Sequence, residues 1–132
     1  MKPYLTDLVV NKVALRINYN KECELGNLMT NLIHIKFPFA DFFVIDLGGL
    51  RVEWFPGVLK EKDLVNMFPM GETLKSFKLL GRDLLKTLKI VQEGNGGFYQ
   101  FYGIQTIATI QNNQRKFISA KMMDGSEIEE SK

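Results

Sequence analysis

Three short segments, in a fixed order, constrain the fold of this chain more than any other feature. Gly26-Asn27-Leu28 lies at the head of an apolar helical pattern, and Asp46-Leu47-Gly48-Gly49-Leu50-Arg51 follows a hydrophobic strand pattern. Phe68-Pro69-Met70-Gly71-Glu72-Thr73-Leu74 comes next along the chain. Each segment alone would indicate only a helix start or a turn. The ordered set is far more specific than any one of its members.

Helical and strand patterns together predict an α+β fold, with helices packed on a mixed sheet. Apolar residues recur at three- and four-residue spacing over residues 25–33, which predicts a helix that Asn20 or Glu22 caps and Pro38 ends. The continuous apolar run within Asp41–Leu47 predicts a strand that is covered on both faces. We expect this strand to be central to the sheet.

The N-terminal residues 1–20 are expected to be a lead-in segment from a preceding domain. Residues Tyr4–Val10 are compatible with a short helix, whereas the alternation of Val13, Leu15 and Ile17 favours a strand. The sequence leaves both structures open.

Glycine-containing steps mark turns in the middle of the chain. By spacing alone, Gly48-Gly49 predicts a two-residue hairpin turn that places Asp46 opposite Arg51 as a cross-strand ion pair. Pro56-Gly57 predicts another turn, and Val58–Phe68 then leads into a second helix.

Segment 72–92 admits two interpretations. A single helix would place its basic residues on one face, opposite apolar residues, as a basic amphipathic rod. These basic residues are Lys75, Lys78, Arg82, Lys86 and Lys89. Gly81 lies in the middle, and a mid-helix glycine costs about 1 kcal/mol relative to alanine. We therefore favour a strand over residues 73–80 and a helix over residues 82–92, with the basic residues as a solvated face.

The C-terminal third predicts further β structure. Glu93–Gly97 predicts a loop, Phe98–Ile110 a long strand, and Asn112-Asn113 a hairpin turn onto Arg115–Met122. Asp124–Lys132 is short and charged and is expected to fray. The aromatic residues of the long strand do not match the pattern of an RNA-recognition module, so we expect no nucleic-acid partner.

Length and composition favour one domain. A chain of 132 residues that is 45% hydrophobic can bury a real core but is too short for two ordinary domains. The net charge of +2 gives no general attraction to nucleic acid. The one cysteine, Cys23, and the lack of an apolar signal-peptide core at the start of the sequence favour an intracellular location over a secreted one. No apolar stretch reaches the ~20 residues that a bilayer span requires.

The single histidine argues against a hydrolytic metal centre in this chain. Such centres generally need several imidazole and carboxylate ligands that converge on one point. His34 lies within an apolar run, so we expect a core or helix-surface residue and no metal ligand.

The ordered motifs resemble the C-terminal, substrate-recognition domain of the 5'-nucleotidase and UDP-sugar hydrolase family. The typical sequence motifs of that family are a GNL-type helix start, a GGGIR loop and an LPFGNTL loop. Leu79-Leu80-Gly81 is similar to the family's LTG, and Gly97–Ile104 is similar to its GxFLQVSGL. The resemblance covers roughly residues 22–122. It implies that Gly48-Gly49 belongs to a strand-terminal loop, in place of the hairpin.

The resemblance also implies that catalysis belongs to another part of such a protein. In the family a separate N-terminal metallophosphoesterase domain binds two divalent metal ions, so no cofactor is expected in this chain. The family's GGDGY segment, which supplies one side of a base-stacking sandwich, would follow Lys132. We expect residues 21–123 to form an incomplete domain, followed by a charged tail at 124–132, that hydrolyses no nucleotide by itself.

By resemblance, two loops are expected to bind the substrate. Arg51 would offer a planar fork of donors to a phosphate or ribose oxygen, while backbone groups around Gly48, Gly49 and Gly71 approach the ligand. Met70 stands where the family has an aromatic ring against the base. Its sulfur can contact a base but cannot stack as a ring does.

Other positions depart from the family pattern. Asp46 heads the glycine-rich loop where the family commonly has a neutral Asn or Ser, and a carboxylate near a phosphate is electrostatically unfavourable. Leu47 replaces the first of three glycines, and Tyr19 stands where an anion-binding arginine is often found. The fold pattern is therefore better preserved than the site.

Two functions of different class follow. The first is nucleotide recognition within a 5'-nucleotidase-type phosphohydrolase that acts in nucleotide catabolism. The second is a degenerate copy that serves as a structural or protein-interaction subunit. In either case a metallophosphoesterase domain or another protein chain is expected to cover the open sheet edge. The element order also permits an unrelated βαββαβ fold.

Overall fold

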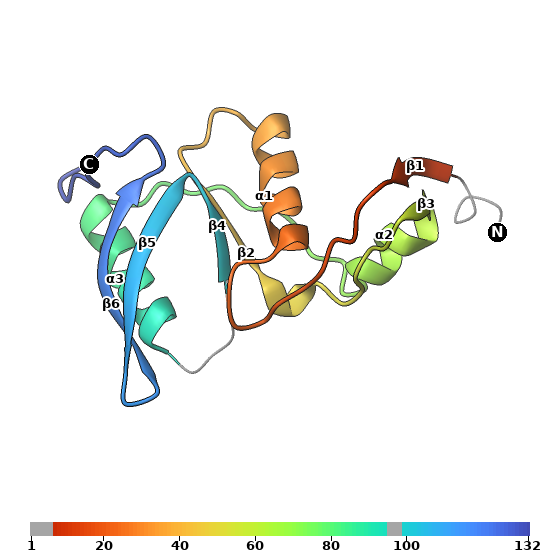
Figure 1. The fold of residues 1–132 in the computed structure, drawn as a ribbon. Helices are drawn as coiled ribbons and strands as arrows, with labels where there is room; N and C mark the ends of the chain where they lie inside the picture. Colours follow the sequence, from red (N-terminus) through yellow and green to blue (C-terminus); the bar gives the residue numbers. More distant parts are fainter. Residues whose placement is uncertain (1–6, 95–98) are drawn as a thin grey trace.

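The computed structural model describes residues 7–94 and 99–132, and Figure 1 shows their arrangement. Helices and antiparallel strand pairs form an α+β fold, which confirms the predicted class. The strands pair as β1 with β3, β2 with β4 and β5 with β6. The elements are β1 (Asp7–Asn11), α1 (Glu24–Lys36), β2 (Phe43–Asp46), a 3-10 turn (Leu47–Gly49), β3 (Gly57–Lys60), α2 (Glu61–Met67), α3 (Gly81–Glu93), β4 (Tyr99–Tyr102), β5 (Ile104–Gln111) and β6 (Gln114–Met122).

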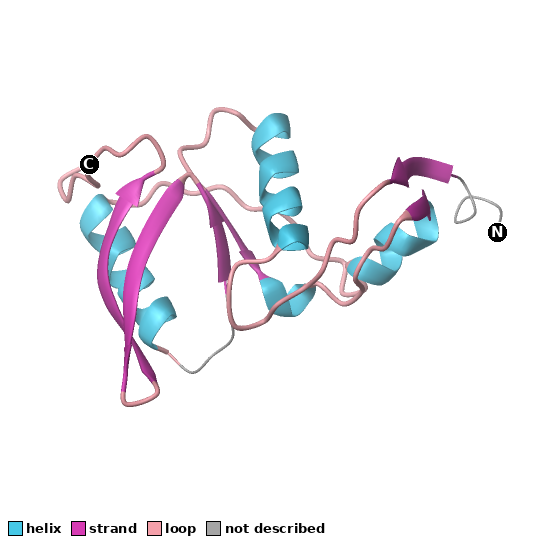
Figure 2. Ribbon diagram, viewed as in Figure 1, coloured by secondary structure: helices cyan, strands magenta, loops and turns pink. Residues whose placement is uncertain are grey.

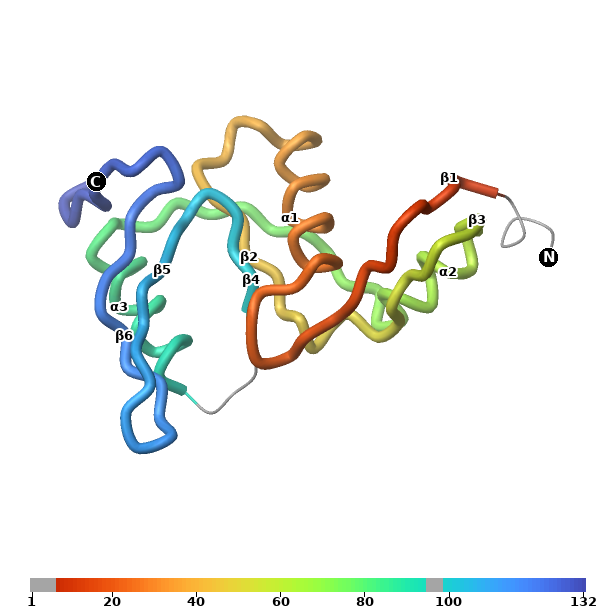
Figure 3. The backbone as a smooth tube through the Cα atoms, in the orientation of Figure 1, coloured from red at the N-terminus to blue at the C-terminus, as the bar shows by residue number. Residues whose placement is uncertain are grey.

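The β2–β4 pair lies between two helical layers. On one side, α1 packs against both strands (Figure 1). On the other side lies α3, which packs on β6 of the β5–β6 hairpin (Figure 2). β1, β3 and α2 form an arm at one end of the molecule, and Figure 3 shows the chain path into this arm and back.

Two separate clusters of buried apolar side chains hold these layers together. The larger cluster joins α1, the 3-10 turn, β3 and the end of α2. The smaller one joins α3 to the hairpin through Leu84, Leu88, Ile104 and Ala120. The members of the larger cluster are Cys23, Leu25, Met29, Leu47, Leu50, Trp54, Leu59 and Met67.

The first predicted helix is confirmed, but neither predicted capping residue caps it. α1 follows Cys23, which makes no side-chain cap hydrogen bond. The preceding turn is held by Asn18, whose Oδ1 accepts the N–H groups of Asn20 and Lys21 at 2.9 and 3.1 Å. A short polar side chain that bonds the backbone two and three residues on stabilises such a turn.

The apolar run at residues 41–47 contains β2, which is shorter than predicted. β2 pairs with β4 from Phe43 opposite Tyr102 to Asp46 opposite Tyr99. No other strand among the described residues pairs with β2, so the predicted central position is wrong for this part of the chain. Val44 stays 40% exposed because a groove borders that face.

The N-terminal segment contains a strand. Residues 7–11 form β1, which corrects the short helix over Tyr4–Val10, and residues 1–6 lie outside the described part. Of the strand pattern over Val13–Ile17, a single bridge forms, between Leu15 and Trp54. β3 provides hydrogen-bond partners for the backbone of β1, whereas a short isolated helix is only marginally stable in water.

β3, the strand that pairs with β1, lies in the segment after Pro56-Gly57, where the sequence predicted only a turn and a helix. Val58 and Leu59 belong to β3, and α2 begins only at Glu61. The helix is confirmed, with a strand before it that the sequence pattern did not show.

α3 confirms the helix predicted after Gly81 and excludes the longer basic rod. The strand predicted over residues 73–80 is wrong. Residues 71–80 have no regular structure, and every one of them is exposed. An extended segment becomes a strand only where a neighbour pairs with its backbone, and no described strand does so here.

The long strand predicted over Phe98–Ile110 is interrupted. Phe98 and the end of the loop predicted before it lie outside the described residues. β4 ends at Tyr102, and Gly103 turns the chain with a φ of 87° before β5 begins. Asn112 and Asn113, with φ values of 50° and 59°, form the predicted hairpin turn.

The C-terminal tail packs on α3, whereas the sequence predicted that it would fray. The N–H of Gly81 donates to the carbonyl of Lys132 at 2.6 Å, and the N–H of Arg82 donates to that of Glu130 at 3.2 Å. These carbonyls satisfy two N–H groups of the first helical turn that have no partner within the helix.

Candidate functional site

The glycine-rich loop (residues 46–51) forms a tight turn at the end of β2. The Asp46 carboxylate accepts the N–H of Gly48 at 2.8 Å, and the N–H of Leu50 donates to the carbonyl of Leu47 at 3.1 Å. Leu47 and Leu50 are fully buried in the larger cluster. Because the chain does not fold back on β2, the predicted hairpin and its Asp46–Arg51 ion pair are absent from the described structure.

The Gly26-Asn27-Leu28 motif joins α1 to the strand behind this loop. A side chain on Gly26 would collide with the amide of Gln100 and with Leu47. Gln100 is buried on β4, and its Nε2 donates to the Asn27 carboxamide oxygen. Its Oε1 accepts the N–H of Cys23 at 3.2 Å. The motif therefore has a structural role, in that it lets helix and strand approach closely enough to share these bonds.

Three segments that are distant in sequence converge at the glycine-rich loop. The Tyr19 hydroxyl donates to the carbonyl of Leu50 at 2.8 Å. The N–H of Arg51 donates to the carbonyl of Met67 at 3.0 Å, which ties the loop to the end of α2. A side chain on Gly49 would collide with the Glu72 carboxylate. The fold thus brings the second and third motifs together.

The predicted binding residues differ in how firmly they are held. Gly48 and Gly49 lie in the braced turn, partly and fully buried. Arg51 is exposed, and its guanidinium forms no ion pair with any described residue. Met70 is 71% exposed, and Gly71 next to it has a φ of 63°. The glycine-rich loop is thus preformed, whereas the Met70 loop lies open to solvent.

Two carboxylates flank this loop. The sequence identified Asp46 as a candidate binding residue but not Glu72. Glu72 occupies the position of the asparagine in the family's LPFGNTL motif. Asp46 occupies the Gly48 N–H, a donor that an anion would otherwise use. A phosphate placed here would meet two negative side chains against one guanidinium, whereas ribose hydroxyls could donate to both carboxylates.

An apolar groove of about 350 Å³ lies next to the loop, between the β2–β4 pair and α3. Asp46 lies at it, and Phe77 and Leu79 of the exposed segment border it. The other lining residues are Phe42, Val44, Leu84, Thr87, Leu88, Val91, Tyr99 and Phe101. We call it the interlayer groove.

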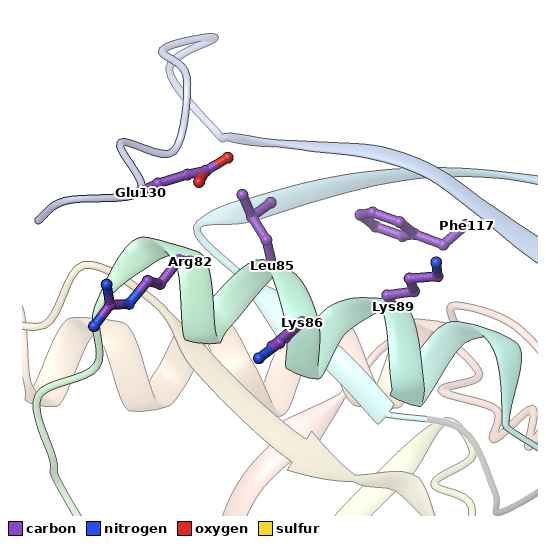
Figure 4. Close-up of a pocket in the computed structure, with 6 residues that line it drawn as sticks. All are labelled: Arg82, Leu85, Lys86, Lys89, Phe117 and Glu130. Carbon is purple, nitrogen blue, oxygen red and sulfur yellow. The ribbon is translucent and has the colours of Figure 1, made fainter.

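A second hollow of about 360 Å³ lies on the opposite face of α3 and carries part of the basic surface (Figure 4). Lys89 extends beside the Phe117 ring, while Arg82 and Lys86 point away from that ring. The described helix therefore does not gather its cations around one point, and the hollow is an ordinary solvated surface.

The described residues do not form a metal centre. No group of three or more His, Cys, Asp and Glu side chains among them is placed to hold an ion. His34 stacks on Tyr102 with ring centroids 4.4 Å apart and lies edge-on to Phe43 at 6.0 Å. The divalent ions of the family's hydrolytic reaction do not fit this part of the chain, so no chemical step is assigned to them here. None of the described helices has the length and hydropathy needed to cross a bilayer.

The family model and the solved structures of similar fold agree with the motif resemblance. The family model described as "5'-nucleotidase, C-terminal domain" matches residues 4–132. A search of curated proteins found no match. Among solved structures, a 5'-nucleotidase precursor from Thermus thermophilus aligns with a TM-score of 0.79 at 21% identity, over 96% of this chain and 28% of its own.

The NAD nucleotidase NadN of Haemophilus influenzae aligns with a TM-score of 0.78 at 19% identity, over 99% of this chain and 27% of its own. The chain thus spans less than a third of these solved proteins, and at such identities they show a shared fold. An unrelated βαββαβ fold is thereby excluded. With the family model matched over almost the whole chain, the chain belongs to the family of 5'-nucleotidase C-terminal domains.

Proposed function

We propose that this chain is the nucleotide-recognition domain of a 5'-nucleotidase-type phosphohydrolase, and that a metallophosphoesterase domain supplies the metal ions and the hydrolysis. The observation that carries the proposal is the convergence of the glycine-rich loop, the Met70 loop and Tyr19. A preformed turn that ends in a guanidinium without an ion-pair partner among the described residues is suited to hold a polar ligand in a fixed orientation.

The charges at the loop favour the nucleoside part of the ligand. Asp46 and Glu72 accept ribose hydroxyls, Met70 contacts the base, and Arg51 is the one cation within the loop. The phosphate then lies toward the metal-bearing domain, away from the two carboxylates.

Titration calorimetry of the purified chain with adenosine and with AMP tests this function. We expect micromolar binding of adenosine that is lost in Arg51→Ala and kept in Arg82→Ala, which removes an exposed arginine on α3. Asp46→Asn keeps an acceptor for the Gly48 N–H but removes the charge, so it should favour AMP relative to adenosine. Binding that Arg51→Ala leaves unchanged would contradict the proposed site.

A phosphate-release assay tests the division of labour. The chain alone should release no phosphate from AMP, with or without added divalent metal. Robust metal-dependent release from a clean preparation would show that this chain contains catalytic groups.

The second candidate, a protein-interaction subunit, is favoured by a different observation. The interlayer groove and the exposed segment beside it present Phe77, 68% exposed, next to a largely apolar lining. Such a surface is typical of a site that another segment of protein covers. No binding of either ligand at millimolar concentration would support this role in place of nucleotide recognition.

A further inference from the structure

The arm at the N-terminal end of the molecule carries an unprotected strand edge. β1 and β3 form a ribbon of two strands, and no other described strand lies beside either of them (Figure 1). A ribbon of two strands is marginally stable in water, and a third strand stabilises it. Proteins usually protect such edges with charges or prolines. The sequence Leu8-Val9-Val10 at the centre of β1 has neither.

The apolar residues of this edge are exposed on both faces of the ribbon. Leu8, Val9 and Val10 are 52, 56 and 63% exposed. Val9 pairs with Leu59 and Val10 pairs with Val58, so the strand is regular over these two positions. The one irregularity in the pairing lies between Asp7 and Val9.

The charges at the ends of this stretch are self-complementary. Asp7 precedes the apolar residues, Lys12 follows Asn11, and no other charge lies between them. When β1 pairs antiparallel with a second copy of itself about the centre of Val9-Val10, Asp7 lies opposite Lys12 of the partner subunit. Both ion pairs form at once because the contact is two-fold symmetric.

Both charged residues are accessible for this contact. Lys12 is exposed and forms no ion pair with a described residue. Asp7 is also exposed and reaches Lys60 across the ribbon at 3.7 Å, a weak surface pair. In the symmetric contact Asp7 would lie between two cations.

We propose that β1 is a homodimerisation strand, and that two copies of this chain join their ribbons edge to edge into one four-stranded antiparallel sheet. The occupant of the edge is a second copy because the segment from Asp7 to Lys12 complements itself in both apolar character and charge. The proposal is independent of nucleotide binding, since the arm contains none of the loop residues.

Sedimentation velocity over a range of concentrations tests the proposal on the full chain. The wild type should form a dimer that dissociates on dilution. Asp7→Lys and Lys12→Asp each replace two attractive pairs with two repulsive ones and should weaken the dimer roughly tenfold. Lys62→Asp, at an exposed position on α2 of the same arm, is the matched control and should leave the dimer unchanged.

Mixing the two single variants gives the decisive result. A heterodimer of Asp7→Lys with Lys12→Asp has opposite charges at both pairs of positions, so the mixture should dimerise about as well as the wild type, whereas each variant alone dimerises about tenfold more weakly. The double variant should likewise regain the dimer. The proposal would be overturned if the wild type stays monomeric at the highest accessible concentration. It would also be overturned if Asp7→Lys and Lys12→Asp dimerise as tightly as the wild type.

Discussion

The glycine-rich loop and the segment at residues 71–80 lie next to each other, yet they are held very differently. In the loop, Leu47 and Leu50 are fully buried, and the Tyr19 hydroxyl and the Met67 carbonyl form hydrogen bonds to its backbone. No N–H of residues 71–80 donates a hydrogen bond within the described chain, and all ten residues are exposed. A sequence motif is thus no measure of local order, because order depends on burial and on backbone partners.

Amide hydrogen exchange should show the largest difference between the two regions. The amides of Leu50 and Arg51 are hydrogen-bonded inside the fold, so they should exchange on the order of a thousandfold more slowly than those of residues 73–80. Mass-spectrometric or NMR exchange on the chain measures both sets together. Equal protection would mean that the 71–80 segment is docked in solution.

Removing apolar volume should separate the two regions by stability. Leu47→Ala leaves a cavity in the larger cluster and should lower the free energy of unfolding by about 2–5 kcal/mol. Met70→Ala removes an exposed side chain and should change it by no more than about 0.5 kcal/mol. Urea denaturation measures both values. A large loss in Met70→Ala would show that the open loop packs against the body.

Two glycine substitutions, with smaller expected losses in the free energy of unfolding, compare a tightly packed glycine with one beside the open segment. In Gly26→Ala the new methyl group meets the buried Gln100 amide and Leu47, and a net loss of about 1–2 kcal/mol is expected despite the better helix propensity of alanine. In Gly49→Ala it meets only the end of Glu72, a flexible exposed side chain, so the loss should be within about 0.5 kcal/mol. Thermal or urea unfolding of the two variants measures both losses. Equal losses would mean that Glu72 is fixed in place.

The smallest expected effect comes from one hydroxyl group. Tyr19→Phe removes the hydrogen bond to the Leu50 carbonyl and should lower the free energy of unfolding by about 1 kcal/mol. Tyr99→Phe removes a hydroxyl that bonds to no described residue and serves as the matched control. If both variants unfold like the wild type, Tyr19 does not brace the loop.

Local patterns predicted the elements that need no distant partner. The helical spacing gave α1 and the second half of segment 72–92, and the Asn112-Asn113 pair gave the β5–β6 hairpin. The motif resemblance predicted the family, which the family model confirms over residues 4–132. These predictions succeed because helix periodicity and turn chemistry are properties of neighbouring residues.

Predictions that depended on partners failed. Residues 73–80 read as a strand but lack a neighbour, and Val58-Leu59 became a strand because β1 lies beside it. Glu72 was missed as a neighbour of the glycine-rich loop because more than twenty positions separate it from Gly49. The binding roles of Asp46, Gly48, Gly49, Arg51, Met70 and Gly71 stay predictions that the titrations address.

The sequence by itself determined the α+β class, the family and the positions of the turns, because spacing and glycine content limit what each local segment can form. Only the tertiary structure decided that Asp46 bonds to the Gly48 N–H and that residues 71–80 stay open. It also decided that β1 presents a free edge. These features depend on which segments meet in space, and pairing between distant backbones leaves no signal in either segment alone.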